Sequence, residues 1–232
     1  MARRSARKAA GSGPPRRSEP ARPVQRRRRP PGLGLIVVTA LVVAAGAAGG
    51  LLLTRSAPPP HQAASAHGKT IDWSSVPHLQ TSAPPWPSES GYLAQRLPSS
   101  GLDALSMEGT VLHRHEHLDV FVNGQRVTVP ALVGIGTGFL TELHTLDPSG
   151  LIHVESPVQR SFALGQFFCE WGIKLNASCL GRYRGELAWW VNGRRMDGNP
   201  ALLPLRQHQE IVIAAGRPPT TVPASYDFPP GL

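Results

Sequence analysis

The pattern of apolar and polar positions changes character twice along this chain of 232 residues. Residues 32–53 form an uncharged apolar run, and residues 54–107 follow neither a helical nor a strand period. Residues 108–216 instead carry the short alternating runs that are typical of strands. Two pairs, Asn123-Gly124 and Asn192-Gly193, separate such runs. Because Asn and Gly accept the positive φ angles of a type I′ turn, each pair predicts a β-hairpin.

A third hairpin is predicted where the turn Asp147-Pro148-Ser149-Gly150 joins residues 140–146 to residues 151–156. A two-residue loop would place His144 opposite His153, whereas a glycine bulge would put the two rings on opposite sides. The side-chain pattern favours the two-residue loop, since only that register separates apolar from polar positions on the two faces.

A helix is predicted from Ser161, as its N-terminal cap, to about Trp171, with Gly172 ready to end it. Its spacing forms one apolar stripe of Leu164, Phe167, Phe168 and Trp171. A last strand is expected over 210–215. The order of elements resembles a small β-grasp-like ββαββ domain over 108–216, with an extra N-terminal β-hairpin, and the expected fold class is α+β.

The apolar run 32–53 is long enough, at about 1.5 Å per residue, to cross a hydrocarbon core of about 30 Å. It predicts one transmembrane helix. Arg26 to Arg29 abut its N-terminal end and only Arg55 follows closely, so the N-terminus is expected in the cytoplasm and the later residues outside. The alternative is a cleaved signal peptide, which the length of the preceding tail, residues 1–31, disfavours.

The formal net charge of +9 comes from residues 1–31, a basic tail with Glu19 as its single acid, which we expect to be disordered. We interpret this tail as a topology signal that also attracts anionic lipid, with a DNA contact as the alternative. The rest of the chain is nearly balanced in charge, so no nucleic-acid partner is expected. Residues 54–107 are expected to form an extended Pro-, Ser- and Ala-rich linker, and residues 217–232 a Pro-rich C-terminal tail.

Histidines are the main chemical feature of the chain. His113, His115 and His117 alternate along a β-prone run, which puts all three imidazoles on one face of a strand. Neutral imidazole is a good ligand for copper and zinc, and carboxylates can complete the shell or orient the rings. The predicted metal site has His113, His115, His144 and His153 as its inner shell, with His117, Glu142 and Glu155 in supporting roles.

Each histidine group has a second interpretation. The alternating triplet could be a solvated face of an edge strand, and His144 and His153 could be hydrogen-bonded residues beside a turn.

Cys169 and Cys179 are the only cysteines, and both fall in the part expected outside the membrane. We therefore expect them to form a disulfide.

Several stretches resemble a family of uncharacterised, membrane-anchored or exported bacterial proteins, and the resemblance covers most of 113–216. Where this chain has Leu146, the family has a second histidine after the one that corresponds to His144. The resemblance implies no established activity. The stretches are His113-x-His115-x-His117-Leu118, Val122-Asn123-Gly124, Val129-Pro130-Ala131, Leu143-His144-Thr145-x-Asp147-x-Ser149-Gly150, Ile152-His153-Val154-Glu155-Ser156 and Leu164-Gly165-Gln166-Phe167-Phe168.

Three functions are compatible with these patterns. The favoured hypothesis is a non-catalytic, extracytoplasmic domain that binds copper or zinc for sensing, delivery or sequestration. The second is a metal-dependent hydrolase or oxidoreductase with Glu142 or Glu155 as general base, which lacks support from any familiar catalytic motif. The third is a cell-envelope interaction module without metal, whose protein partner the sequence does not identify.

Overall fold

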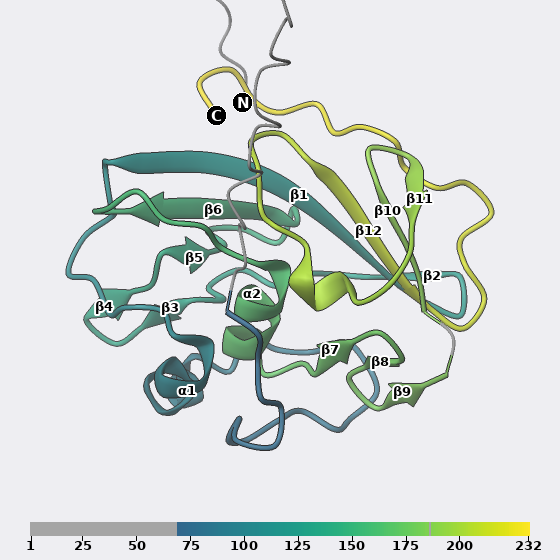
Figure 1. Cartoon of the computed structure of the whole chain (residues 1–232), viewed down its shortest axis with the longest axis horizontal. Helices are drawn as coiled ribbons and strands as arrows, with labels where there is room; N and C mark the ends of the chain where they lie inside the picture. Colours follow the sequence, from purple (N-terminus) through teal and green to yellow (C-terminus); the bar gives the residue numbers. More distant parts are fainter. Residues whose placement is uncertain (1–68, 186) are drawn as a thin grey trace, which may run out of the picture. The chain divides into compact units, whose positions relative to one another are not determined.

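The computed structural model of the protein describes residues 69–185 and 187–232. Figure 1 shows their arrangement as helices and strands. In chain order the elements are η1 (Ser90–Tyr92), α1 (Leu93–Ser100), β1 (Leu112–Val122), β2 (Gln125–Val127), β3 (Ile135–Gly136), β4 (Phe139–Leu140), β5 (Leu143–His144), β6 (Leu151–Ser156), α2 (Leu164–Trp171), β7 (Leu175–Asn176), β8 (Cys179–Leu180), β9 (Tyr183–Arg184), β10 (Leu187–Val191), β11 (Arg194–Met196), η2 (Pro200–Leu202) and β12 (Glu210–Ala215).

A seven-stranded mixed sheet in the order β11-β10-β12-β1-β6-β5, with β2 paired to β1, forms the centre of the described fold. Strand β1 runs for eleven residues and is therefore long enough to have several neighbours. Its first half pairs antiparallel with β6, and its second half pairs parallel with β12 and antiparallel with β2. The histidine-bearing strand is thus internal to the sheet.

Helix α2 packs on one face of this sheet (Figure 1). Its predicted apolar stripe is confirmed, because Leu164, Phe167, Phe168 and Trp171 are fully buried in the main core. The predicted start is wrong: the helix begins at Leu164, not near Ser161. The backbone N–H of Ala163 donates to the side chain of Gln166 at 2.9 Å, and this contact fixes the first turn there.

The predicted α+β, β-grasp-like ββαββ domain is wrong. The described residues are mainly strands in three separate sheets, and their two α-helices have only eight residues each. The hairpin that was expected as an N-terminal addition instead supplies the central strand, because β1 pairs along its length with three other strands. Short local patterns predicted the hairpins, but these long-range pairings determine the architecture.

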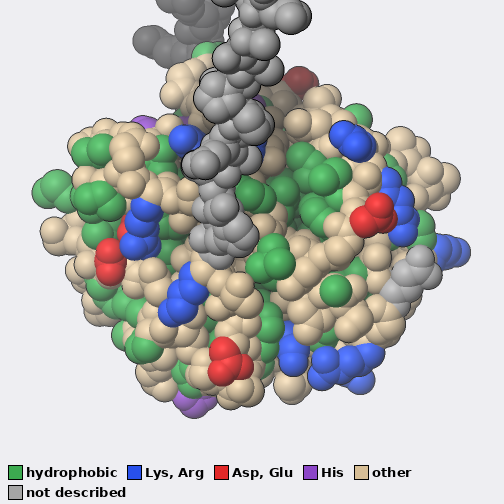
Figure 2. All heavy atoms as spheres, in the orientation of Figure 1, with side chains coloured by type: hydrophobic (Ala, Val, Ile, Leu, Met, Phe, Trp, Pro, Cys, Tyr) green, Lys and Arg blue, Asp and Glu red, His purple; other side chains and the backbone are tan. Residues whose placement is uncertain are grey.

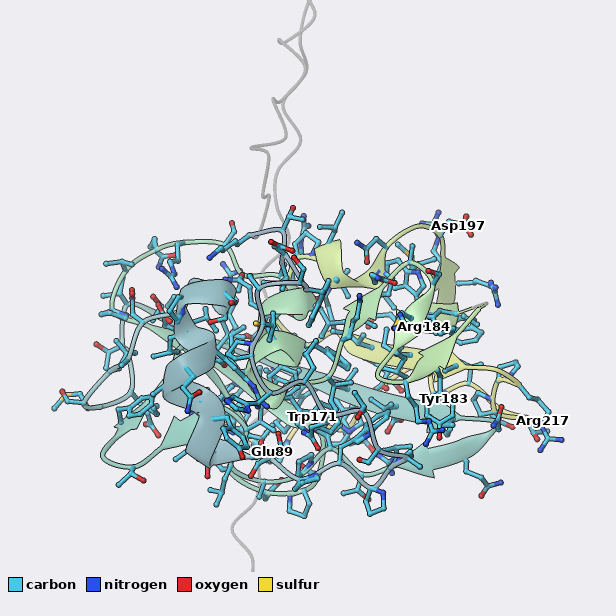
Figure 3. All side chains as sticks on the ribbon, turned by 90° about the horizontal axis from the view of Figure 1, so that it is seen from below. Glu89, Trp171, Tyr183, Arg184, Asp197 and Arg217 are labelled. Atoms are coloured by element: carbon cyan, nitrogen blue, oxygen red, sulfur yellow. The ribbon has the colours of Figure 1, made fainter. Side chains whose placement is uncertain are left out.

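Residues 69–107, expected to belong to an extended linker over 54–107, are packed on the domain instead. They contain η1 and α1, and Trp86 is only 1% exposed. The Trp86 ring contacts Trp171 edge-on, with ring centroids 5.9 Å apart, and also approaches the ring of Tyr183. In Figure 3, Trp171 lies in the view between Glu89 and Tyr183. Residues 69–107 therefore pack against the core and do not form part of an extended linker.

The buried side chain of Arg96 in α1 joins this segment to the end of α2. Its guanidinium donates to the carbonyl oxygen of Glu170 at 3.0 Å and to the Glu89 carboxylate at 2.8 Å. Gly172 ends α2 with φ of 74°, and a Cβ there would lie 2.4 Å from the guanidinium. Glycine is thus required at this helix end both for its left-handed conformation and for the approach of Arg96.

The C-terminal segment, residues 217–232, passes over the sheet face that lies opposite α2 (Figure 1). Val222 packs against the apolar cluster that Phe121 and Trp190 form on this face. Further along, Tyr226 stacks on His117. The segment expected to be a Pro-rich tail therefore covers part of the histidine-bearing face.

The predicted transmembrane helix over 32–53 and the basic tail over 1–31 lie outside the described residues. Within residues 69–185 and 187–232, no helix is both long and apolar enough to cross a membrane. On the face drawn in Figure 2, basic and acidic side chains are scattered among hydrophobic ones and do not gather into one charged patch.

The predicted disulfide is wrong, because Cys169 and Cys179 are both free thiols and both buried. Cys169 lies on the side of α2 that packs against Ile71 and Val76. Cys179 lies in the small sheet of β7, β8 and β9, where its sulfur contacts the carbonyl oxygen of Gly181 at 3.1 Å. The two side chains thus belong to different packing environments. Burial raises the pKa of the Cys169 thiol to about 12, which keeps it protonated.

Candidate metal centre

Strand register brings five of the predicted residues into two adjacent rows. His115 in β1 pairs with His153 in β6, and His153 pairs on its other side with His144 in β5. In the next row His113 pairs with Glu155. The predicted pairing of His144 with His153 is therefore confirmed. Because side chains alternate along each strand, these residues all lie on the sheet face opposite α2.

The imidazole rings are in mutual contact. The ring centroids of His113 and His115 lie 4.8 Å apart, those of His115 and His153 lie 4.8 Å apart, and those of His144 and His153 lie 5.2 Å apart. One nitrogen from each of His113, His115 and His153 and one oxygen of Glu155 all lie within 4.8 Å of one another. Ligand atoms of a tetrahedral ion, each bonded at about 2.0–2.1 Å, lie about 3–4 Å apart, so these four atoms would have to move closer together to bind one ion.

The cluster is nearly closed to solvent. His115, His153 and Glu155 are buried, and His144 is fully buried, while the side chain of His113 is 54% exposed. The exposed ring of His113 therefore forms the solvent-facing side of the group. This arrangement could admit an ion from one side without opening the sheet.

Several buried polar atoms of this cluster have no hydrogen-bond partner among the described residues. They are Nδ1 and Nε2 of His115, Nε2 of His144 and Oε2 of Glu155. A buried polar atom without a partner costs about 1–3 kcal/mol, and most such atoms in native proteins are satisfied. Four of them gathered at one place form a donor set that fits a bound metal ion.

The electrostatic environment favours the neutral form of His115 and His144 and the charged form of the Glu155 carboxylate. Burial, with a smaller contribution from His153 and His113, lowers the pKa of His115 to about 4. Burial likewise lowers the pKa of His144, against the opposing effect of its hydrogen bond to Thr141. Burial by itself raises the pKa of Glu155, but the His153 hydrogen bond and the nearby rings outweigh it and lower the pKa. Neutral imidazole and ionised carboxylate are the forms that bind metals.

Glu155 is the central carboxylate of the cluster. Its Oε1 lies 3.1 Å from Nε2 of His113 and 3.2 Å from Nδ1 of His153. Its other oxygen, Oε2, lies 3.8 Å from Nε2 of His144. The sequence predicted a supporting role for Glu155, whereas its carboxylate oxygens lie among the candidate ligand atoms themselves.

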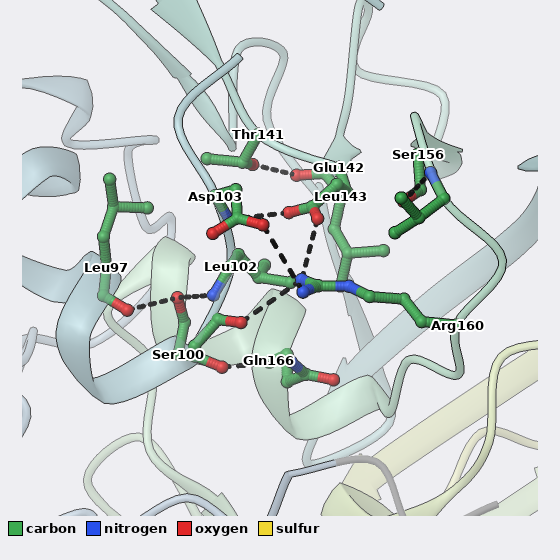
Figure 4. A network of polar contacts seen from close by, with 12 residues as sticks. Leu97, Ser100, Leu102, Asp103, Thr141, Glu142, Leu143, Ser156, Arg160 and Gln166 are labelled. Atoms are coloured by element: carbon green, nitrogen blue, oxygen red, sulfur yellow. Dashed lines mark hydrogen bonds and ion pairs between the residues drawn. The ribbon is translucent and has the colours of Figure 1, made fainter. Parts of the chain in front are cut away.

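Glu142 does not join the histidines, although its place beside β5 suggested that it would. Arg160 approaches its Oε1 at 2.7 Å, and the backbone N–H of Asp103 donates to its Oε2 at 2.8 Å (Figure 4). The guanidinium also lies 3.5 Å from the Asp103 carboxylate. Both carboxylate oxygens of Glu142 are thus engaged by groups that the sequence did not connect with it.

His117 also stands apart from the cluster. Its Nδ1 lies 2.7 Å from Oε2 of Glu210, and its Nε2 lies 3.0 Å from the carbonyl oxygen of Ser149. The side chains of His117, Asp119 and Glu210 come close together, but the Asp119 carboxylate is paired with Arg126. Since both ring nitrogens of His117 already have partners, we assign it a structural role.

Two carboxylates near the cluster escaped the sequence analysis. Glu210 begins β12 and reaches His117 only because β12 pairs in parallel with β1. Glu108 precedes β1, and one of its oxygens lies within 4.8 Å of a His144 nitrogen and a Glu155 oxygen. No spacing rule relates either residue to the histidines, so sequence alone offered no signal for them.

Comparison with known protein families, curated proteins and solved structures finds no match to this chain. The resemblance to exported bacterial proteins therefore stays a prediction.

Proposed function

We propose that this protein is a single-pass, membrane-anchored protein whose extracytoplasmic domain binds a copper or zinc ion without catalysing a reaction. The ligands are His113, His115, His153 and Glu155. The membrane anchor is residues 32–53, and the N-terminus is cytoplasmic, as the arginines before the apolar run indicate. The lipid bilayer and the metal ion are thus the two proposed partners.

One observation carries the proposal. Both ring nitrogens of His115 are buried without a hydrogen-bond partner in the described part of the chain, and they lie beside two further rings and a carboxylate. If the His115 ring served only the stability of the fold, an apolar side chain of similar volume would make the fold more stable, because it has no polar atoms to leave without partners. A metal ion bound to one nitrogen gives the ring a partner and accounts for its neighbours.

The contacts of the Glu142 carboxylate support a binding role without catalysis. This residue was a candidate general base, but Arg160 and the Asp103 N–H hold both its oxygens. The remaining candidate base, Glu155, belongs to the ligand set and is oriented by His113 and His153. No free carboxylate base is therefore available beside the proposed ion within the described structure, apart from the exposed Glu108.

The test measures metal in the full-length chain, purified in detergent without a polyhistidine tag. Elemental analysis follows dialysis against ZnCl₂ or CuSO₄ and then against metal-free buffer. We expect retained metal in the wild-type protein and its loss in His115→Ala and His153→Ala. The matched control is the double variant His61→Ala/His67→Ala, which removes two histidines that are not among the proposed ligands and should retain the metal.

An absence of retained copper or zinc in the wild-type protein would refute the proposed function. That result would instead favour an interaction module without metal. Retention in both cluster variants, with loss in the control, would place the ion elsewhere and equally contradict the proposal.

A further inference from the structure

A second group of ligand atoms lies directly against the proposed centre. One oxygen of Glu108, one nitrogen of His144 and one oxygen of Glu155 lie within 4.8 Å of one another. His144 and Glu155 are buried, whereas Glu108 is exposed. Glu155 is shared, because it also belongs to the group formed with His113, His115 and His153.

The hydrogen bond of His144 determines which of its nitrogens is free. The Nδ1–H group donates to the backbone carbonyl oxygen of Thr141 at 3.0 Å, since a carbonyl oxygen can only accept. In the neutral ring Nε2 then carries the lone pair. This nitrogen is buried without a hydrogen-bond partner among the described residues. A hydrogen bond from Nδ1 to a carbonyl is the usual way in which a metal-ligating histidine is oriented.

The free nitrogen of His144 faces an equally free oxygen. Oε2 of Glu155 lies 3.8 Å from it and has no hydrogen-bond partner in the described region, while Oε1 is used by His113 and His153. A separation of 3.8 Å is too long for a hydrogen bond. Two acceptors that face each other in a buried place repel unless a cation lies between them.

Backbone packing holds Glu108 beside this pair. The next residue, Gly109, is buried, and a Cβ there would lie 2.1 Å from the carbonyl carbon of Ser156. Only glycine therefore lets the chain pass so close to the end of β6. The Val111 N–H donates to the Ser156 carbonyl oxygen at 3.1 Å and continues the same contact. Glu108 is thus carried to the side of Glu155 by the main chain.

We propose that Glu108, His144 and Glu155 form a second divalent-metal position, bridged to the first by the two oxygens of Glu155. This inference rests on the proposed function, because Glu155 would bind the first ion through Oε1. Paired metal positions in proteins commonly lie about 3.5–4 Å apart. The expected occupant is a second copper or zinc ion, since the donors are imidazole and carboxylate rather than oxygen alone.

The charges of the site are consistent with two ions. The first group supplies three imidazole rings and the Glu155 carboxylate, and the second adds the carboxylate of Glu108. The carboxylate of Glu142 cannot contribute, because it is already paired with Arg160. Glu155 is shared between the two groups, and His144 is buried. Glu108 is exposed and belongs only to the second group, so it can be changed without disturbing a buried side chain.

The experiment counts ions in the full-length, untagged chain in detergent, in the His61→Ala/His67→Ala background that leaves only the histidines of the described residues. Elemental analysis after equilibrium dialysis with CuSO₄ should give two copper ions per chain, and Glu108→Gln should reduce this to one. The matched control is Asp197→Asn, which alters another exposed carboxylate and should leave the content at two.

Electron paramagnetic resonance of the copper-loaded protein provides a second readout, which does not depend on counting the ions. Two bridged Cu²⁺ ions should couple and give a half-field transition, which Glu108→Gln should abolish while an isolated Cu²⁺ signal remains. One uncoupled copper per chain in the wild-type protein would overturn the second position and leave the proposed function intact. So would two uncoupled ions that Glu108→Gln does not change. Absence of any bound copper or zinc would remove both proposals together.

Discussion

The imidazole of His117 stacks on the phenol ring of Tyr226, with ring centroids 3.9 Å apart and ring planes 6° from parallel. Tyr226 in turn meets Phe228 edge-on, at a centroid distance of 5.0 Å. Through these contacts the C-terminal segment is fixed to the same sheet face that carries the histidine cluster. The segment thereby shields the buried pair of His117 and Glu210 from water.

Replacement of Tyr226 by alanine should destabilise the protein modestly. An aromatic contact is worth about 0.5–1.5 kcal/mol beyond the area that it buries, so the free energy of unfolding should fall by at least this amount. Urea denaturation followed by tryptophan fluorescence measures the change. Metal content should stay at the wild-type level, because Tyr226 contacts His117 and not the cluster. A loss of metal in Tyr226→Ala would contradict the structural role of His117.

Replacement of His115 by leucine should have opposite effects in the two states of the protein. Without metal, leucine removes a buried ring that lacks hydrogen-bond partners, and the free energy of unfolding should rise by about 1–3 kcal/mol. With metal present at 100 times its dissociation constant, the wild-type protein gains about 2.7 kcal/mol by mass action from the first position, and the variant loses this gain. Thermal melts with EDTA and with ZnCl₂ measure both. A variant that is less stable than wild type in EDTA would show that the ring is well satisfied without metal.

The contribution of His115 to the stability of the metal-free protein should fall as the pH is lowered from about 6.5 to about 4. The pKa of His115 is lowered to about 4 from 6.5, so the folded state disfavours the charged ring. The stability that its neutral form contributes is complete above the unfolded pKa and is lost as the unfolded chain takes up the proton. Urea denaturation in EDTA at several pH values measures the slope.

The comparison with His115→Leu isolates this contribution to the pH dependence. Burial raises the pKa of Glu116 and of Glu170, and such groups change stability in the opposite sense. These carboxyl groups remain in the variant, so the difference between the two curves reports His115. Parallel curves for the two proteins between pH 6.5 and 4 would be inconsistent with the lowered pKa.

Loss of Arg160 should destabilise the fold while leaving metal binding unchanged. Arg160→Ala deprives the buried Glu142 carboxylate of its charged partner, which we expect to cost about 1–3 kcal/mol. Adding Glu142→Gln should recover part of this loss, because the uncompensated charge is removed. A double-mutant cycle in urea measures the coupling. Additive effects of the two substitutions would argue against the ion pair, and loss of metal in either variant would return Glu142 to the ligand set.

Both cysteines should be present as thiols. Unfolding in urea without reductant, followed by iodoacetamide, should add two alkyl groups, whereas the native protein should react slowly because both sulfurs are buried. Mass spectrometry counts the groups. An unlabelled chain that gains two groups only after reduction would restore the disulfide that the structure excludes.

Local sequence patterns predicted the parts of this molecule that depend on neighbouring residues. The pairs Asn123-Gly124 and Asn192-Gly193 have positive φ angles and join paired strands as expected. The alternation of apolar and polar residues correctly set His144 opposite His153. These features were accessible because a two-residue turn and a period of two leave few registers that keep one face apolar.

The partners of the histidines were decided by contacts between distant parts of the chain. His113, His115 and His117 are equivalent in sequence, yet β6 brings Glu155 and His153 to the first two, while β12 brings Glu210 to the third. Glu108 reaches His144 because Gly109 permits close packing, and Arg160 removes Glu142 from the group. The sequence by itself thus determined which side chains share a face of each strand, since the pleat has a local period. Only the tertiary structure decided which strands are neighbours, because that choice depends on burying the whole apolar face against α2 and the segment that contains Trp86.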